Sequence, residues 1–388
     1  MSRKILIFVF LLCISLCINP KPAAAAENPL AVANNKMGIH ILSELELPQA
    51  AQLVNSNGGD WGYVIVPIQS VDKDLIKWQK FMDDCKRYRV IPIIRIATEG
   101  DYFNTAVWRE PNPADIIDFA NFLDSLEWPT KNRYVIIFNE VNRGDEWGGS
   151  ANPKEYAELL SFSVSVFKSM NSDFFIISAG MDNAAPEEGT KYTNQYNYLR
   201  RMNQAVPGIF NQIDGISSHS YPNPGFSQPP NPRSMMGVGS FAHERALIRT
   251  MSNKDLPVFI TETGWSAEVV NDDKRAQYYA QAFQTVWSDP GIVTVMPFLL
   301  QAGAGPFQKF TFITADGNKT KQYQTLFSIP KVKGIPSYPT TRVLSAKTSR
   351  TSDIRDFSEY QRETRSFSVS TVLQDVFEYL INSKAPSF

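Results

Sequence analysis

The stretch Val258-Phe259-Ile260-Thr261-Glu262-Thr263-Gly264-Trp265 begins as a short apolar run and then presents a carboxylate. Turn-forming residues bound the run on both sides, as is typical of a buried strand. An earlier stretch, Tyr134-Val135-Ile136-Ile137-Phe138-Asn139-Glu140, repeats the pattern and also ends in a glutamate. Two strands that end in the same way predict that the two glutamates lie at one edge of one sheet.

Apolar runs of this kind alternate with helical patterns along the chain. Helix-starting pairs such as Asn112-Pro113 and Asn152-Pro153 separate them. Eight strands separated by helices predict a (β/α)8 barrel over residues 35–330, near the usual size for that fold. A doubly wound open sheet is the alternative, but it normally carries a glycine-rich phosphate loop after its first strand, and the sequence has none there. The expected strands are 37–41, 61–68, 90–97, 134–140, 174–178, 213–218, 258–261 and 293–300.

The first 26 residues predict a secretory signal and no part of the fold. Arg3 and Lys4 precede an apolar run at 5–18, and a tract of four alanines ends at Ala26. That order is typical of an export signal that is cleaved after Ala26. The apolar run is short for a bilayer span, so we expect cleavage and no stable membrane insertion. The protein is therefore expected to be secreted, to the periplasm or to the extracellular space.

The composition excludes some classes of partner and of covalent cross-link. Over the whole sequence, 38 basic and 39 acidic side chains balance, which gives no electrostatic basis for binding nucleic acid. Two of the three cysteines lie in the predicted signal, so Cys85 alone remains and the mature chain is expected to have no disulfide. Residues 331–388 become rich in Ser, Thr and Arg, which predicts a tail that is partly disordered. Within it, residues 370–381 are compatible with a short terminal helix.

Residues at the carboxyl ends of barrel strands face the active site in this fold. Glu140 and Glu262 are then expected to face each other across the mouth. Two carboxyls about 5–5.5 Å apart can cleave a glycosidic bond with retention, one as the acid and the other as the nucleophile. The acid needs a raised pKa, and hydrogen-bond donors must keep the nucleophile ionised. The same positional rule adds a group of candidates that could bind substrate: His40, Asn139, His219, Tyr221, Trp265 and Gln301.

Neighbouring side chains are suited to support such a pair. Asn139 is expected to donate to a sugar hydroxyl, and Tyr221 to the nucleophile carboxylate. Arg95 lies inside an otherwise apolar run. It either helps to keep Glu262 ionised or pairs with a carboxylate in the core. Trp265 is expected to offer a flat surface to a sugar ring, so the expected partner is a carbohydrate.

The three histidines, His40, His219 and His243, lack metal-ligand spacing such as His-x-x-x-His, so no catalytic metal and no cofactor are expected. His219 precedes Tyr221 by two residues and therefore lies on the same side of its strand. It is expected to hydrogen-bond near either carboxyl, with a purely structural histidine as the alternative. For His40, a role in substrate binding and a purely structural role are equally compatible with the sequence.

Three motifs, taken together, resemble the clan A glycoside hydrolases. They are Phe138-Asn139-Glu140, His219-Ser220-Tyr221 and residues 260–265, in this order on three of the expected strands. This clan comprises retaining (β/α)8 enzymes and includes the cellulase-like families 5 and 39. The resemblance implies that Glu140 is the acid/base and Glu262 the nucleophile. It also implies a secreted retaining β-glycoside hydrolase that acts on an oligo- or polysaccharide by double displacement.

Some positions depart from the family 5 pattern. That family usually has an arginine at the end of strand two, a proline after the acid/base and a tryptophan after strand eight. In this chain the end of strand two reads Val-Ile-Val-Pro (residues 64–67), Val141 follows the acid/base, and strand eight ends in Phe-Leu-Leu-Gln (residues 298–301). These differences leave open which family of the clan the chain resembles most and which sugar it binds. Two other functions remain: a non-catalytic carbohydrate-binding protein on a glycosidase-like barrel, and a transglycosylase. Both glutamates are present, which favours an enzyme.

Overall fold

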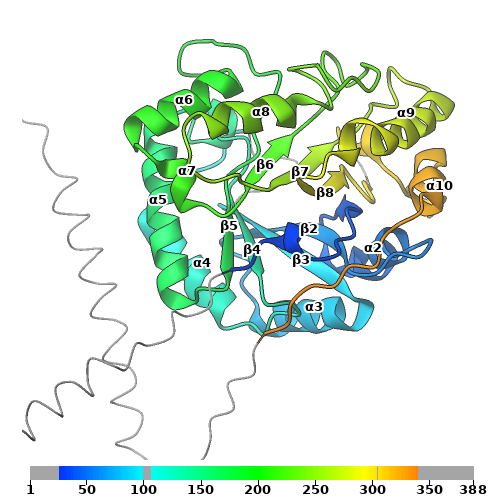
Figure 1. Cartoon of the computed structure of the whole chain (residues 1–388), viewed down its shortest axis with the longest axis horizontal. Coiled ribbons are helices and arrows are strands. Elements are labelled where there is room, and N and C mark those ends of the chain that lie inside the picture. The colour runs from blue at the N-terminus through cyan, green and yellow to red at the C-terminus, as the bar shows by residue number, and fades with distance from the viewer. Residues whose placement is uncertain (1–25, 99–105, 304, 340–388) are drawn as a thin grey trace, which may run out of the picture. The chain divides into compact units, whose positions relative to one another are not determined.

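In the part of the chain that the structure describes, eight parallel strands alternate with helices (Figure 1). The strands are β1 (Gly38–His40), β2 (Gly62–Gln69), β3 (Val90–Ala97), β4 (Arg133–Ile137), β5 (Phe174–Ile177), β6 (Ile216–His219), β7 (Val258–Thr263) and β8 (Ile292–Pro297). This is a computed structural model, and it describes residues 26–98, 106–303 and 305–339. Strands β1 to β5 pair in chain order, and so do β6 to β8. The parallel bridges Ile177↔Gly215 and Met37↔Val295 join the two sheets at both edges. The barrel is therefore closed, which confirms the predicted (β/α)8 fold and excludes the open sheet.

Helices surround this barrel (Figure 1). Asn112 and Asn152 cap their helices as predicted, because each side chain accepts hydrogen bonds from backbone amides of the first turn. The helix over Leu75–Tyr88 is capped by Asp74, while the nearby Asp72 accepts a hydrogen bond from Lys77. The helices are α2 (Leu47–Val54), α3 (Leu75–Tyr88), α4 (Pro113–Asp124), α5 (Pro153–Met170), α6 (Gln195–Ala205), α7 (Ile209–Gln212), α8 (Ser240–Arg249), α9 (Asp272–Gln284) and α10 (Lys321–Ser328).

Strand side chains alternate between the barrel interior and the layer beneath the helices. On β2, for example, Tyr63 and Ile65 point inward, whereas Val64 and Val66 join the core that packs against the helices. The interior cluster fills the barrel below its mouth and is largely aromatic and β-branched. It comprises Trp61, Tyr63, Ile65, Ile91, Ile93, Tyr134, Ile136, Phe175, Ile177, Phe259, Val293 and Met296.

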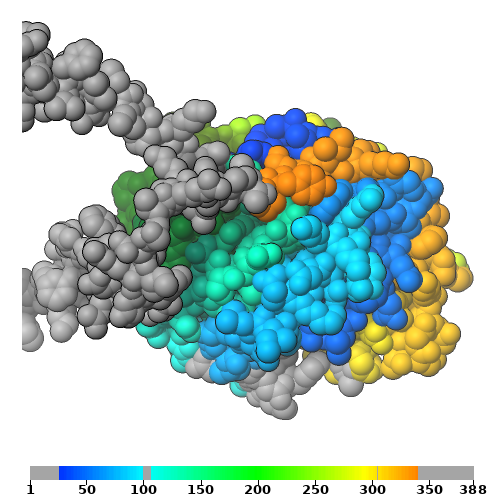
Figure 2. Space-filling model, turned by 90° about the horizontal axis from the view of Figure 1, so that it is seen from below, coloured from blue at the N-terminus to red at the C-terminus, as the bar shows by residue number. Residues whose placement is uncertain are grey.

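Segments from both ends of the described chain lie against the barrel. Ile335 donates its backbone N–H to Ala33 at 2.8 Å, and Gly334 donates to Asp60 at 2.9 Å. Figure 2 shows the C-terminal segment beside the N-terminal residues on this face. The barrel domain therefore extends on both sides of the predicted range 35–330, and residues 331–339 are not part of a loose tail.

Residues 1–25 of the predicted signal, and the tail from residue 340 with its predicted helix at 370–381, lie outside the described residues. Within the described ranges, the helices are all too short or too polar to cross a membrane.

Candidate active site

The turn after β4 presents two polar side chains at the mouth of the barrel. Phe138 and Glu140 both adopt left-handed backbone conformations, with φ of 67° and 35°. Such angles are uncommon outside glycine and are found at functional sites that the surroundings hold in place. Here the Glu140 N–H donates to the carbonyl of Gly180 at 2.9 Å, and the Phe138 ring packs edge-on against Trp147. Asn139 and Glu140 are thereby fixed at the mouth.

At the end of β7, a β-bulge positions the glutamate. Ser218 of β6 pairs with Ile260, but the next residue, His219, pairs with Glu262. Thr261 is therefore an extra residue in β7, and such a bulge re-aims the side chain that follows it. The Thr261 hydroxyl is 2.5 Å from that of Ser217, which anchors the bulge on β6. Because of this irregularity, Glu262 lies beside His219.

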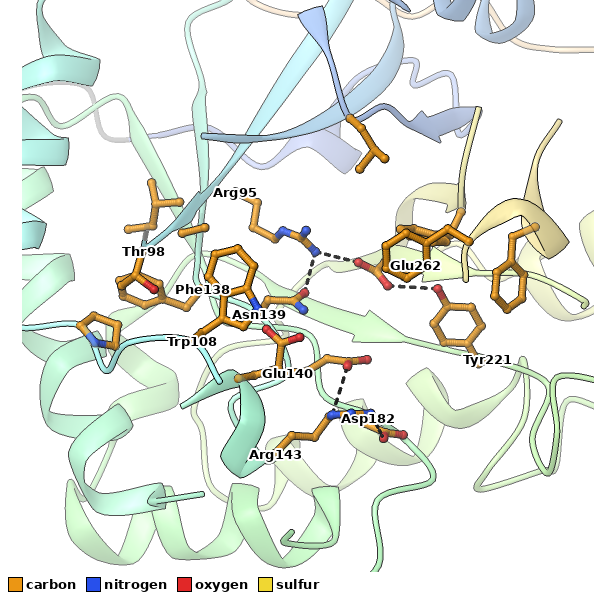
Figure 3. Close-up of a pocket in the computed structure, with 18 of the residues that line it drawn as sticks. Arg95, Thr98, Trp108, Phe138, Asn139, Glu140, Arg143, Asp182, Tyr221 and Glu262 are labelled. Atoms are coloured by element: carbon orange, nitrogen blue, oxygen red, sulfur yellow. Dashed lines mark hydrogen bonds and ion pairs between the residues drawn. The ribbon is translucent and has the colours of Figure 1, made fainter. Parts of the chain in front are cut away.

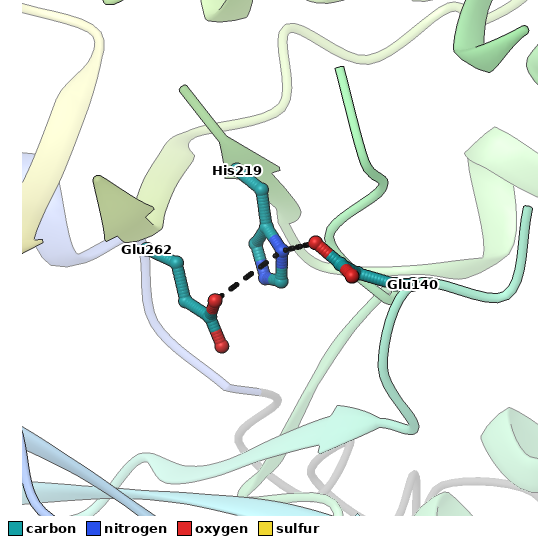
Figure 4. Close-up of side chains that lie close together, drawn as sticks. All are labelled: Glu140, His219 and Glu262. Atoms are coloured by element: carbon teal, nitrogen blue, oxygen red, sulfur yellow. Dashed lines mark hydrogen bonds and ion pairs between the residues drawn. The ribbon is translucent and has the colours of Figure 1, made fainter. Parts of the chain in front are cut away.

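His219 lies between the two carboxyls (Figure 4). Its Nδ1 is 2.9 Å from Glu140 Oε1 and 3.7 Å from Glu262 Oε2. One oxygen of each glutamate and one nitrogen of His219 all lie within 4.8 Å of one another. The carboxylate spacing is therefore much nearer to the 5–5.5 Å of retaining glycosidases than to the 6.5–9.5 Å of inverting ones.

Two donors hold Glu262 (Figure 3). Arg95 Nη1 is 2.7 Å from Glu262 Oε1, and the Tyr221 hydroxyl donates to Oε2 at 3.0 Å. Burial alone would raise the pKa of Glu262, but the nearby charges of His219 and Arg95, with the Tyr221 hydrogen bond, lower it to about 2. Glu262 is thus ionised at neutral pH, as a nucleophile must be.

Glu140 has the opposite electrostatic environment. Burial raises its pKa, the hydrogen bond and charge of His219 oppose that rise, and the negative charges of Asp182 and Glu262 add to it. The pKa of His219 is itself raised, because the attraction of both glutamates exceeds the cost of its burial. A carboxyl with a raised pKa beside an ionised one is the arrangement expected of an acid and nucleophile pair.

His40 lies beneath this pair and is fully buried. Its Nε2 is 3.7 Å from Glu262 Oε1, and its ring packs edge-on against Phe298. Burial and the charge of Arg95 lower the pKa of His40 to about 3, so its imidazole is neutral at neutral pH. It supports the floor of the site and does not line the cavity.

Comparison with known proteins bears on the fold. No protein-family model and no curated protein matches the sequence. Among solved structures, a family 39 glycoside hydrolase from Bacteroides cellulosilyticus WH2 has a TM-score of 0.52 at 15% identity, covering 79% of this chain and 64% of that chain. A family 39 β-xylosidase from Caulobacter crescentus has a TM-score of 0.55 at 15% identity, covering 79% and 72%.

A family 5 protein (GH5_18) from Streptomyces cattleya, solved with Manβ1-4GlcNAc, has a TM-score of 0.51 at 14% identity, covering 73% of each chain. The fold is shared with glycoside hydrolases of families 39 and 5. These are the two families that the sequence motifs resemble. The chain spans about two thirds of the first of these structures, with 64% of that chain covered.

Four sequence-predicted residues are not among those that line the cavity: His40, His219, Trp265 and Gln301. His40 and His219 still contact the two glutamates. The Trp265 side chain is fully buried, packs against Tyr279 and Trp287, and donates its indole N–H to the carbonyl of Gln228 at 2.8 Å. It offers no face to a sugar ring, so the expectation of a sugar platform at Trp265 is corrected. Gln301 pairs through its backbone with the loop after β8 and is not among the cavity-lining residues.

The cavity at the mouth has a volume of about 320 Å³, within the range of small-molecule sites. Its aromatic side chains come from the loops after β3, β4, β6 and β8, and the charged side chains of Arg143 and Asp182 lie beside Glu140 (Figure 3). Most of the cavity wall could not be predicted because its residues come from loops. The residues that were not predicted include Leu42, Pro111, Arg143, Glu146, Asp182, Phe298, Phe307 and Phe310.

Glu140, His219 and Glu262 are also close enough together to surround a cation. Carboxylate and imidazole are suitable ligands for several divalent metals. However, His219 already hydrogen-bonds Glu140, and Arg95 already neutralises Glu262. The charges of the site are therefore balanced by protein groups, and the geometry is explained without a metal.

Proposed function

We propose that this protein is a retaining β-glycoside hydrolase with Glu140 as the acid/base and Glu262 as the nucleophile. The observation that carries the proposal is the pair itself: two carboxyls of closely spaced oxygens whose pKa values are shifted in opposite directions. The shared fold of family 39 and family 5 glycoside hydrolases supports it. A non-catalytic binding protein has no need of such a pair.

The first step would form a covalent glycosyl-enzyme. A Glu262 oxygen attacks the anomeric carbon while the bond from that carbon to the leaving oxygen breaks, and the Glu140 proton moves to that oxygen. Negative charge leaves Glu262 as the ester forms and appears on Glu140 as it loses its proton. His219, which contacts both carboxyls, is placed to stabilise either distribution.

The second step would reverse these roles. Glu140, now ionised, removes a proton from water, and the water oxygen attacks the anomeric carbon and displaces Glu262. Arg95 and Tyr221 receive the restored carboxylate through the hydrogen bonds that they make in the free protein. Two displacements return the original anomeric configuration.

The experiment is a screen of aryl β-glycosides and common polysaccharides, followed by proton NMR of the first product formed from the best substrate. We expect the initial product to keep the β configuration. The Glu140→Ala variant should lose about 10²- to 10⁴-fold in kcat/KM, which reports the first step, on a sugar leaving group and much less on a dinitrophenyl leaving group, which needs no proton. An initial α product, or equal losses on both leaving groups, would contradict the assignment.

The proposal includes export. Residues 1–26 have the order of a secretory signal: a basic start, an apolar run and a tract of four alanines. N-terminal sequencing of the protein from the culture medium or periplasm should begin at Glu27. A protein that stays with the cytoplasm and keeps Met1 or Ser2 would contradict export.

A further inference from the structure

Besides Glu140 and Glu262, the cavity is lined by Asp182, which pairs with Arg143, and by Glu146, which the proposed mechanism does not use. Glu146 is the last residue of the 3-10 helix η3 (Gly144–Glu146), which follows the turn after β4. Backbone hydrogen bonds fix this helix, with the Glu146 N–H donating to Arg143 at 3.2 Å and the Gly144 N–H to Lys191 at 2.7 Å. Glu146 lines the cavity together with Asn139 and Glu140.

The orientation of Asn139 follows from its contact with Arg95. Arg95 Nη1 is 2.6 Å from Asn139 Oδ1 and 2.7 Å from Glu262 Oε1. A guanidinium only donates, so the oxygen of the Asn139 amide faces Arg95 and its NH₂ group faces the other way. That NH₂ group lies on the Glu146 side, where it favours the ionised carboxyl and so lowers the pKa of Glu146. A continuous chain thus joins Glu262, Arg95, Asn139 and Glu146.

The charges around Glu146 leave it able to accept a hydrogen bond near neutral pH. Burial and the negative charge of Glu140 raise its pKa to about 7, while Arg95, Asn139 and Arg143 oppose that rise. The closest ion pairs of Arg143 are with Asp145 at 2.6 Å and Asp182 at 3.1 Å. A neutral hydroxyl that donates to Glu146 would stabilise its ionised form.

We infer that Glu146 determines specificity for the sugar hydroxyl next to the anomeric carbon, accepting the hydrogen of the same hydroxyl to which Asn139 donates. Asn139 and Glu262 share one nitrogen of Arg95, so the Asn139 amide lies next to the atom that the nucleophile attacks. In an aldose ring, the neighbouring carbon that bears a hydroxyl is C2. This inference rests on the proposed function.

A hydroxyl matches this site because it both accepts and donates. An ammonium group only donates, so it would face the Asn139 N–H and the Arg95 charge without an acceptor for them. A sugar without a substituent at C2 would leave Asn139 and Glu146 without this partner, and sites built to bind a hydroxyl reject such analogues strongly. The inferred substrate class is therefore sugars with a free 2-hydroxyl.

The test compares kcat/KM on an aryl glycoside with that on its 2-deoxy counterpart. The variants are Glu146→Ala, Glu146→Gln and the control Glu188→Gln, an exposed carboxyl on the neighbouring loop. Glu146→Ala should lower kcat/KM for the 2-hydroxy substrate about 10- to 100-fold and that for the 2-deoxy substrate less than about threefold. The control should match the wild type on both substrates.

A pH profile supplies a second readout. In the wild type, the preference for the 2-hydroxy over the 2-deoxy substrate should increase as pH rises through about 7, because Glu146 then ionises and accepts more strongly. Loss of the Glu140 proton lowers both rates and cancels in the ratio. Glu146→Gln keeps an acceptor oxygen but cannot ionise, so its preference should be intermediate and independent of pH. Thermal unfolding shows whether Glu146→Ala fails to fold. In that case the preference of Glu146→Gln for the two substrates, and its pH dependence, test the inference.

Equal losses on both substrates would overturn the inference, since Glu146 would then only support Asn139. Unchanged activity of Glu146→Ala on both substrates would also overturn the inference. If the wild type cleaved neither glycoside nor any member of the screen, the proposed function would fail instead, so the two failures are distinguishable.

Discussion

The ends of β4 and β7 carry the same residue type and have opposite properties. Glu262 receives hydrogen bonds from Arg95 and Tyr221, which help to lower its pKa to about 2. Glu140 is buried near Asp182 and Glu262, and its pKa is raised. The comparison shows that the roles of two glutamates are set by the donors and charges around them, and the most informative experiments exchange or remove those surroundings.

The largest effect is expected from removing the carboxyl at the end of β7. Glu262→Ala should reduce kcat on the best aryl glycoside by at least about 10⁴-fold whatever the leaving group, because no covalent intermediate can form. Steady-state kinetics with added azide measures this. Azide should not restore a product of retained configuration in Glu262→Ala, whereas in Glu140→Ala it should. The reverse pattern would exchange the two roles.

Arg95→Met should reduce the difference in pKa between Glu262 at the end of β7 and Glu140 at the end of β4. Arg95 helps to hold the pKa of Glu262 at about 2, so without it that pKa rises toward its ordinary value. The ionised form is required, so the acid limb of kcat/KM should move to higher pH. The rate at neutral pH should fall about 100-fold or more, since Glu262 and Asn139 lose their shared anchor. An acid limb that does not move would contradict this role of Arg95.

Gly180→Ala should displace His219, which contacts both glutamates, and its effect on activity should be smaller than that of Arg95→Met. A Cβ at this position would overlap the His219 ring, and the Gly180 carbonyl accepts the Glu140 N–H. Displacement of His219 should lower kcat/KM about 10- to 100-fold. Gly303→Ala is a control at an exposed position where an added Cβ meets no neighbour and φ is not left-handed. A Gly180→Ala variant with wild-type kinetics would show that the position of His219 is unimportant.

The smallest effect on activity is expected at Trp265, although it is only three residues from Glu262. Trp265→Phe removes a buried hydrogen bond to Gln228 and part of a packed indole. It should cost about 1–4 kcal/mol of unfolding free energy and leave KM nearly unchanged. Denaturant unfolding and steady-state kinetics measure both. A large rise in KM with unchanged stability would restore Trp265 as a sugar platform.

The barrel, and the two strand ends that carry Glu140 and Glu262, could be predicted because each depends on local pattern. Apolar runs mark the strands, and residues at their carboxyl ends meet at one mouth. The bulge at Thr261 could not be predicted, since it depends on pairing with β6. Strict alternation from the inward-facing Phe259 would have placed Glu262 on the outer side of the barrel.

The loop-borne part of the site was also beyond the sequence. Arg143, Glu146 and Asp182 follow no strand directly, and long-range backbone contacts such as Gly144 to Lys191 bring them to the cavity. Trp265 was misassigned for the opposite reason. It directly follows a strand end, but its indole turns into the core between the barrel and α9. Position along the chain therefore predicted which strand ends meet, and not which side chains face the cavity.

The account depends most directly on which carboxyl becomes covalently attached to the sugar. A 2-deoxy-2-fluoro glycoside with a good leaving group, based on the best substrate from the screen, slows the second step of a retaining enzyme and allows the intermediate to accumulate. Peptide mass spectrometry of the trapped protein should locate the sugar on Glu262. A sugar attached to Glu140, or to any other carboxyl, would contradict the account.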